Sequence, residues 1–569
     1  MTGRFGGVLL AVMSRRHSFL ATIALAVSLL FGSSTADAFC GFYVGGAGAK
    51  LFNDATVVVM MREGTRTVLS MQNAYKGPPE KFAMVVPVPV VLQEENVKTL
   101  KRELFDHIDQ LASPRLVEYW EQDPCAQMMA DLKARSAPVA LAAAAPAAKA
   151  EGREDLGVKI EAQFAVGEYQ IVILSAQDSG GLETWLHREG YNIPEGGEPY
   201  FRPYVASGSK FFVAKVDVTK VKMEDGLAML SPIRFHYDSE EFKLPVRLGL
   251  INSSGTQDLI VHILGRGTRY ELANYPNVTI PTNLEVSEAA SDKFGTFYTT
   301  LFDRTLEKNP KAIVTEYAWE PTSCDPCPGP PMDFGDLSTF GLDVLPSTLG
   351  QQPTAPQPVM PPGLPSKPGA AAPPSLGKTP PPSRRFNPWQ GGPLVLTRLH
   401  ARYTKDSLGE DITFRAAPPI VGGREMMGTG GKLEHGAQPS GFNNFQARYA
   451  IRHPWTGPIE CKEPVRGVWG GKPGGAHERP APKSAQKLGL APRAKTELAS
   501  FVKQDIPEIG FTKGTTTTGG AGGGAAGTPP DASKKGCLGC ALTEREGSVS
   551  AAWLAVLGSL VLAVRRRKP

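Results

Sequence analysis

The chain has 569 residues and a formal net charge of +5, with 41% hydrophobic and 21% charged residues. These values are typical of a folded protein and exclude a collagen, a wholly disordered chain and a disulfide-dense miniprotein. Five excess positive charges over this length are too dilute to indicate a nucleic-acid-binding protein, so no nucleic-acid partner is expected. The 61 glycines and 50 prolines exceed ordinary usage and predict that part of the chain is linker.

The first 38 residues have the pattern of a secretory signal peptide. The basic group Arg15–His17 precedes the apolar run Phe19–Phe31, and the small-residue triplet Ala36–Ala38 follows. This order matches the n-region, h-region and cleavage site of an export signal. We therefore expect an exported protein whose residues 1–38 are removed, so that the mature chain begins at Phe39.

The segment after the signal is predicted to be mainly β-strand. Glu63-Gly64 and Gly167-Glu168 each separate two strand-like runs, which predicts two hairpins. Pro87 and Pro89 favour an edge or irregular strand for the apolar run Phe82–Val91.

Helical spacing occurs in one region between these hairpins. Apolar residues from Val97 to Leu111 recur at helical intervals and predict a helix that faces the core. Ser113-Pro114 then predicts the start of a second helix, which would carry Leu116, Val117 and Trp120. The strand runs do not alternate regularly with helices. The predicted fold class is therefore α+β, a β-rich exported body with a few packed helices.

Shifts in composition predict the domain boundaries. Residues 137–150 are almost entirely Ala and Pro, residues 328–393 contain 18 prolines, and residues 471–536 are rich in Gly, Thr, Pro and Lys. The predicted organisation is a signal peptide (1–38), a first part of the body (39–327, with the Ala-rich insertion 137–150), a Pro-rich linker or loop (328–393), a second part of the body (394–470), a stalk (471–536) and a C-terminal tail (537–569).

The tail has the pattern of a membrane anchor. The run Val549–Val564 is interrupted only by Ser and Gly, and the basic cluster Arg565–Lys568 follows at once. Such an element predicts one transmembrane helix with its basic end in the cytoplasm. Its 16 residues reach about 24 Å as a helix, which is short for a full span.

Two cysteines precede this helix, and the three features together resemble the myxobacterial (MYXO-CTERM-type) C-terminal sorting tail. The features are the motif Cys537–Cys540, the short apolar helix and the terminal arginine cluster. The resemblance implies cleavage near the cysteine and delivery, with a lipid anchor, to the outer membrane or cell surface. Cys537 and Cys540 are the candidates for sorting or lipid attachment. The partners implied are the membrane and the export and sorting machinery, and the alternative is a permanent single-pass anchor.

Five cysteines lie in the predicted body, namely Cys40, Cys125, Cys324, Cys327 and Cys461. Disulfides are the default in an oxidising compartment, and the sequence does not decide their connectivity. Cys324-Asp325-Pro326-Cys327 has the spacing of a thiol–disulfide exchange motif. The prolines that follow prevent a helix from starting there, so a structural disulfide is favoured. A zinc site formed by these two cysteines with Cys461 and His453 ranks lower, because a second tightly spaced pair is missing.

Several separated motifs of the body resemble the bacterial domain-of-unknown-function family 2330. The likeness covers roughly residues 39–470 apart from the linkers. The motifs are Phe39–Val44, Phe82–Pro89, Leu182 to Tyr191 with Trp185, Cys324–Cys327, and His453-Pro454-Trp455 ahead of Cys461. The resemblance implies an exported bacterial protein and assigns neither an activity nor a catalytic residue.

Standard catalytic signatures are missing from the sequence. It contains no G-x-S-x-G, no H-E-x-x-H and no P-loop, so no catalytic, cofactor-binding or metal-binding residue is assigned and no cofactor is expected. The function favoured is a non-catalytic binding or structural ectodomain that the stalk holds away from the membrane. The alternative is an extracytoplasmic enzyme, a hydrolase or a thiol-redox enzyme, whose site is assembled from residues far apart in the sequence.

Overall fold

The structure is a computed structural model of the chain. It describes residues 42–43, 56–72, 83–125, 158–190, 196–224, 227–250, 256–347, 392–404, 407–424, 433–473, 481–486 and 497–513. The signal peptide, Cys40, the Ala-rich insertion, Cys537, Cys540 and the predicted transmembrane helix lie outside these residues. None of the helices within these ranges is both long enough and apolar enough to cross a membrane.

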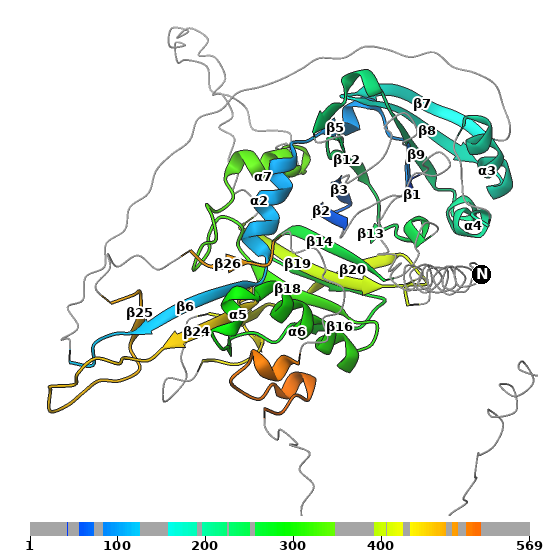
Figure 1. Cartoon of the computed structure of the whole chain (residues 1–569). Helices are drawn as coiled ribbons and strands as arrows, with labels where there is room; N and C mark the ends of the chain where they lie inside the picture. Colours follow the sequence, from blue (N-terminus) through cyan, green and yellow to red (C-terminus); the bar gives the residue numbers. More distant parts are fainter. Residues whose placement is uncertain are drawn as a thin grey trace, which may run out of the picture. The chain divides into compact units, whose positions relative to one another are not determined.

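The largest element is a mixed sheet, whose main run of strands is β22-β21-β23-β18-β19-β14-β2-β3-β12-β5, with β16 paired to β18 (Figure 1). The bounds are β22 (Gln438–Pro439), β21 (Ile420–Gly422), β23 (Asn444–Gln446), β18 (Ile313–Trp319), β19 (Leu394–Tyr403), β14 (Gln257–Arg266), β2 (Thr56–Glu63), β3 (Arg66–Met71), β12 (Ile233–Asp238), β5 (Val97–Thr99) and β16 (Asn277–Thr279). β14 pairs with β19 antiparallel and with β2 parallel. These three central strands come from distant parts of the sequence.

A second sheet packs on one face of the large sheet. Its order is β1-β4-β9-β8-β7, with bounds β1 (Phe42–Tyr43), β4 (Ala83–Val88), β9 (Lys210–Val216), β8 (Tyr169–Ala176) and β7 (Val158–Val166). The apolar residues between the two sheets include Met84, Ile171 and Phe212 from the second sheet, and Met60 and Ile263 from the large one. The predicted irregular strand is β4, and Pro87 lies beyond the part of β4 that β1 pairs with.

Helices cover the outer faces of the two sheets, which makes four layers. α3 (Ser179–Arg188) and α4 (Glu198–Ala206) pack on the second sheet, as Figure 1 shows. α2 (Arg102–Ala112) and α7 (Phe334–Phe340) pack on the far face of the large sheet. α6 (Phe294–Lys308), preceded by α5 (Ala289–Asp292), forms a further core with residues of β18, β23 and β24 (Arg448–His453). The described residues thus form the β-rich α+β fold that the sequence predicts.

Three smaller sheets complete the fold. A three-stranded sheet contains β13 (Lys243–Leu244), β20 (Ile412–Ala417) and β15 (Arg269–Leu272). A five-stranded sheet contains β17 (Leu284–Glu285), β24 (Arg448–His453), β6 (Arg115–Glu121), β25 (Trp469–Gly470) and β26 (Lys483–Ser484), and a two-stranded sheet contains β10 (Lys222–Glu224) and β11 (Leu227–Met229).

The local predictions have mixed outcomes. Both hairpins are confirmed: β2 and β3 turn at Gly64 and β7 and β8 turn at Gly167, each with positive φ. The predicted helix is confirmed as α2. The second predicted helix is wrong, because Arg115–Glu121 is strand β6, which pairs with β24 on one edge and with β25 and β26 on the other. Pairing on both edges outweighs the local helical pattern.

The folded body also extends into two segments that the sequence predicts to be linker. α7 lies within 328–393, and its Phe340 is buried against the helix-covered face of the large sheet. The short 3₁₀ helices η6 (Leu498–Ser500) and η7 (Pro507–Ile509) lie within the predicted stalk, and Phe501 and Val502 are buried beside α6. A few apolar residues anchor each segment although its composition is that of a linker.

Four of the five body cysteines form two disulfides. Cys125 is bonded to Cys461, 336 residues away, and joins the segment after β6 to the loop after β24. Cys324 is bonded to Cys327, only three residues away. The zinc hypothesis is therefore wrong, since all three of its cysteines are in disulfides.

Replacement of Cys125 and Cys461 together by Ser is predicted to lower the free energy of unfolding by about 2–5 kcal/mol, because this disulfide restricts a long loop in the unfolded chain. Replacement of Cys324 and Cys327 is predicted to cost measurably less, because the loop between them is short. Urea denaturation of the oxidised proteins checks both values. A larger loss for the Cys324–Cys327 pair would contradict this account.

Candidate ligand-binding pocket and the buried charge cluster beside it

A cluster of charged side chains is buried between the large sheet and two helices. Arg398 of β19 forms ion pairs with Glu316 of β18, at 2.8 Å from Nε to Oε2, and with Asp109 of α2. Its Nη1 also donates a hydrogen bond to Ser113 at 3.0 Å. The Arg398 side chain is only 2% exposed, and that of Glu316 is fully buried. A guanidinium buried to this extent is stable only when its charge and donors are satisfied.

His400, two residues further along β19, continues the cluster on the same face. Its Nε2 lies 3.0 Å from Asp258 Oδ1 and its Nδ1 lies 3.4 Å from Glu316 Oε1. Tyr298 of α6 donates a hydrogen bond to Glu316 at 2.6 Å. Burial lowers the pKa of His400, but the two carboxylates outweigh this effect and raise it above its ordinary value.

Glu316 holds the negative charge at the centre of the cluster. Burial raises its pKa, but His400 and Arg398 lower it more, to about 2. The register between β18 and β19 shifts between Thr315 and Tyr317, so Glu316 is the extra residue of a β-bulge. Bulges redirect side chains, and this one lets Glu316 contact both cations. Because Arg398, His400 and Glu316 are at most 2% exposed, we interpret the cluster as structural rather than catalytic.

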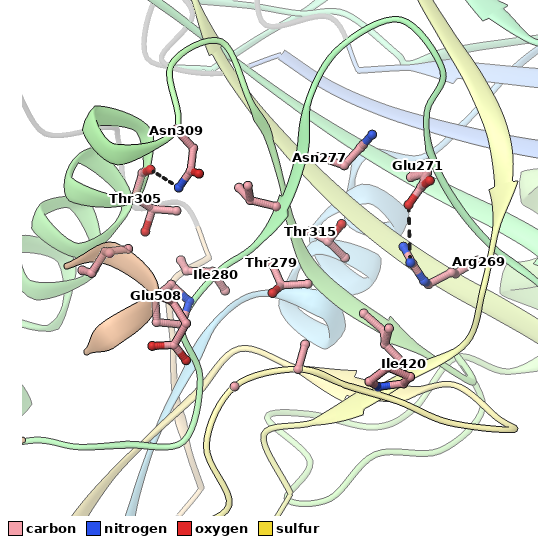
Figure 2. Close-up of a pocket in the computed structure, with 16 residues that line it drawn as sticks. Arg269, Glu271, Asn277, Thr279, Ile280, Thr305, Asn309, Thr315, Ile420 and Glu508 are labelled. Carbon is pink, nitrogen blue, oxygen red and sulfur yellow. Dashed lines mark hydrogen bonds and ion pairs between the residues drawn. The ribbon is translucent and has the colours of Figure 1, made fainter. Parts of the chain in front are cut away.

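A pocket of about 440 Å³ lies close to this cluster, because Thr315, the neighbour of Glu316 on β18, is part of its wall (Figure 2). Its wall comes from β15, β16, the end of α6, β18, the start of β21, the segment around β22, and η7. The volume falls within the range of small-molecule sites. The charged side chains in its described wall are Arg269, Glu271 and Glu508.

One end of the pocket carries an arginine and a glutamate from β15. Arg269 Nη2 lies 3.4 Å from Glu271 Oε2, and Arg415 of β20 lies 2.8 Å from Glu271 Oε1. Two guanidinium groups thus share one carboxylate, which leaves a net positive charge at this end. Burial lowers the pKa of Arg269, and Glu271 opposes part of that effect. Arg269 is only 8% exposed.

The opposite end of the pocket carries Glu508 of η7, as Figure 2 shows. Its Oε1 lies 2.7 Å from His435 Nδ1. Burial raises the pKa of Glu508, but the hydrogen bond from His435 outweighs it and lowers the pKa below the ordinary value. Gly436 approaches the same carboxylate with φ of +69°, and a Cβ there would lie 2.9 Å from Glu508 Oε1. The left-handed backbone favours glycine at this position, and a larger residue would displace the Glu508 carboxylate.

The floor between the two ends is the short strand β16. Thr279 and Thr315 are register partners on β16 and β18, and Figure 2 shows them side by side in the middle of the pocket. Asn277 fixes the start of β16, because its side chain accepts a hydrogen bond from Leu272 N and donates one to Leu272 O, both at 2.8 Å. The β15–β16 turn is thereby held closed.

No motif in the sequence points to the charged residues of this pocket. Arg269 and Glu271 alternate on a strand that resembles a solvent-facing edge, and Glu508 lies in a segment with the composition of a stalk. The hydroxyl and amide side chains that β16 and α6 contribute to the pocket do not belong to any recognisable sequence motif. The sequence-predicted His453 lies elsewhere, where its Nε2 is 3.0 Å from Glu118 Oε2. Across the described ranges, no group of three or more His, Cys, Asp or Glu residues is placed to hold a metal ion.

Fold and site together define a β-rich α+β domain with a polar pocket and a buried ionic cluster. The chain belongs to the family described as "Uncharacterized protein conserved in bacteria (DUF2330)", whose model matches residues 34–415, more than half of the chain. Comparison with curated proteins and with solved structures gives no match. The family match includes β15, β16 and the charge cluster, and it ends before Ile420, His435 and Glu508.

The variant Glu316→Gln is predicted to lower the free energy of unfolding by about 3–5 kcal/mol at pH 7, because it leaves Arg398 and His400 buried with one carboxylate fewer. Glu316 has a lowered pKa in the folded state, so its contribution is present above pH 4.5 and is lost as pH falls towards about 2. The difference from the wild type should therefore shrink over that interval. Urea denaturation at pH 7 and pH 3 measures it.

Glu307→Gln is the matched control for this prediction. Glu307 pairs with Arg304 on the exposed side of α6, with both side chains about half exposed. Exposed pairs contribute little, so this variant should change stability by less than about 1 kcal/mol at either pH. Equal losses for the two variants would contradict the structural role of the buried cluster.

Proposed function

We propose that the chain is an exported, non-catalytic binding domain that holds a small polar ligand in the pocket between β16, β22 and η7. The observation that carries this proposal is the pocket itself, which has about 440 Å³ of space, opposite charges at its two ends, and threonine hydroxyls between them. Such a set of polar groups in a concave site orients a ligand. The nearby titratable cluster around Glu316 is buried and serves the fold instead.

Export and anchoring are part of the same proposal. Two disulfides support an oxidising compartment, which agrees with the predicted signal peptide. The predicted tail, Val549–Lys568, would then hold the domain at the cell surface or the outer membrane, either through a lipid on Cys537 or Cys540 or as a single-pass helix.

The alternative function, an extracytoplasmic enzyme, has less support. Glu271 and Glu508 are each held by a cationic or hydrogen-bonding partner, and neither is paired with a nucleophile among the residues described. Thiol-redox chemistry would need a cysteine at the start of a helix. Cys324 and Cys327 precede α7 by several residues, and prolines lie between.

Deletion of residues 549–569 is predicted to release the domain into the periplasm or the medium, because this segment is the anchor in our proposal. Cell fractionation followed by immunoblotting measures the shift, with the full chain as reference. A truncated protein that stays with the membrane would show that the anchor lies elsewhere.

The binding function is tested with a variant that fills the pocket. Ile420 lines the pocket, and Ile420→Trp should occupy part of its volume. After incubation with a small-molecule extract of bacterial periplasm, native mass spectrometry should detect retained mass on the wild type and little on the variant. Equal retention, or none on either protein, would contradict a binding function for this pocket.

A further inference from the structure

The floor of the pocket is an open strand edge. β16 is parallel to β18, and the bonds Ile313 N to Pro276 O and Ile280 N to Thr315 O fix which backbone groups face β18. In a parallel pair, alternate residues of one strand direct both their N–H and C=O groups to the partner. Pro276, Val278 and Ile280 therefore face β18, while Asn277 and Thr279 direct these groups to the other side.

That other side is the pocket. Asn277 and Thr279 both line it, and β18 is the only strand that pairs with β16 within the described ranges. An unpaired strand edge can accept an extended peptide through backbone hydrogen bonds. Three residues of β16 span roughly 10 Å, which is the length of an extended tripeptide.

The charges at the two ends fit the two ends of such a peptide. β16 begins beside Arg269 and Glu271 and runs towards Glu508, as Figure 2 shows. Arg269 Nη1 has no partner among the described residues, while Nε donates to Pro418 O and Nη2 contacts Glu271. A free guanidinium N–H in a net positive surrounding favours a carboxylate. Glu508 at the far end favours an ammonium group.

From this arrangement we infer that the pocket binds a short, free peptide of two or three residues as an added strand antiparallel to β16. The C-terminal carboxylate of the peptide contacts Arg269, its N-terminal ammonium contacts Glu508, and its backbone pairs with Thr279. The apolar part of the pocket wall includes Ile280, Ile420 and Ile509. These side chains carry no charge or hydrogen-bonding group, so they do not select a particular peptide side chain. This inference rests on the proposed binding function and names the ligand class of the same site.

Isothermal titration calorimetry of the full chain with tri-alanine tests the inference. Tri-alanine should bind, and its N-acetylated and C-amidated forms should each bind about tenfold more weakly or worse, because each loses one charge-assisted hydrogen bond. Arg269→Gln should weaken binding of free tri-alanine but leave the amidated form nearly unchanged. Glu508→Gln should weaken binding of free tri-alanine but leave binding of the acetylated form nearly unchanged.

Two further comparisons separate binding from stability. Arg304→Gln removes a positive charge from the exposed side of α6 and should leave every affinity unchanged. Thr279→Pro removes the outward N–H without removing a backbone bond to β18, and should weaken the free and blocked peptides alike. Thermal melting of each variant confirms that it is folded.

The inference is overturned if free and blocked tri-alanine bind equally, or if Arg269→Gln weakens the free and amidated forms by the same factor. It is also overturned if tri-alanine does not bind at millimolar concentration. In that case, mass retained from the periplasmic extract by the wild type, and not by Ile420→Trp, would leave the binding function standing with another ligand class. If neither protein retains mass from the extract, both the peptide inference and the proposed binding function are contradicted.

Discussion

The buried guanidinium of Arg398 is the constraint on which the arrangement of the fold depends. It lies on β19, near the middle of the large sheet, and its charge is balanced by Asp109 from α2 and Glu316 from β18. A charge in this position would cost several kcal/mol if either carboxylate were missing. The ion pairs therefore fix α2 and β18 relative to β19, although these three elements come from distant parts of the sequence.

The same cluster sets the geometry of the pocket. Tyr298 of α6 is hydrogen-bonded to Glu316, and about two to three turns further along, Thr305 and the C-cap residue Asn309 line the pocket. Thr315, the neighbour of the bulged Glu316, lies on the pocket floor. Two walls of the pocket are thus held by the buried ion pairs, while Arg269 and Glu508 lie outside the cluster and face the ligand space. A binding site orients a polar ligand when its binding groups are held in place by a rigid scaffold, and the buried cluster provides that scaffold here.

The sequence predicts the features that depend on local chemistry. Glycines at the turns predict both hairpins, and apolar spacing predicts α2. It does not predict β6, because the segment after Pro114 has apolar residues at intervals that suit a helix, and only pairing with β24 makes it a strand.

Long-range relations account for the remaining differences. Charged residues at alternate positions of β19, such as Arg398 and His400, resemble the exposed face of a strand, and their burial depends on Asp109 and Glu316 far away in the sequence. The composition of 471–536 predicts a stalk and therefore gives no signal for the buried Phe501 or for the pocket residue Glu508. The disulfide between Cys125 and Cys461 is one of many pairings that the sequence allows.

Hydrogen exchange at single-residue resolution tests most directly whether the floor of the pocket is an open strand edge. The account predicts that the amide of Val278, which faces β18, is strongly protected, while the amide of Thr279 exchanges quickly in the free protein. It also predicts that saturating tri-alanine slows exchange at Thr279. Equal protection of the two amides in the free protein would show that the outer edge of β16 is already paired, and would contradict the account.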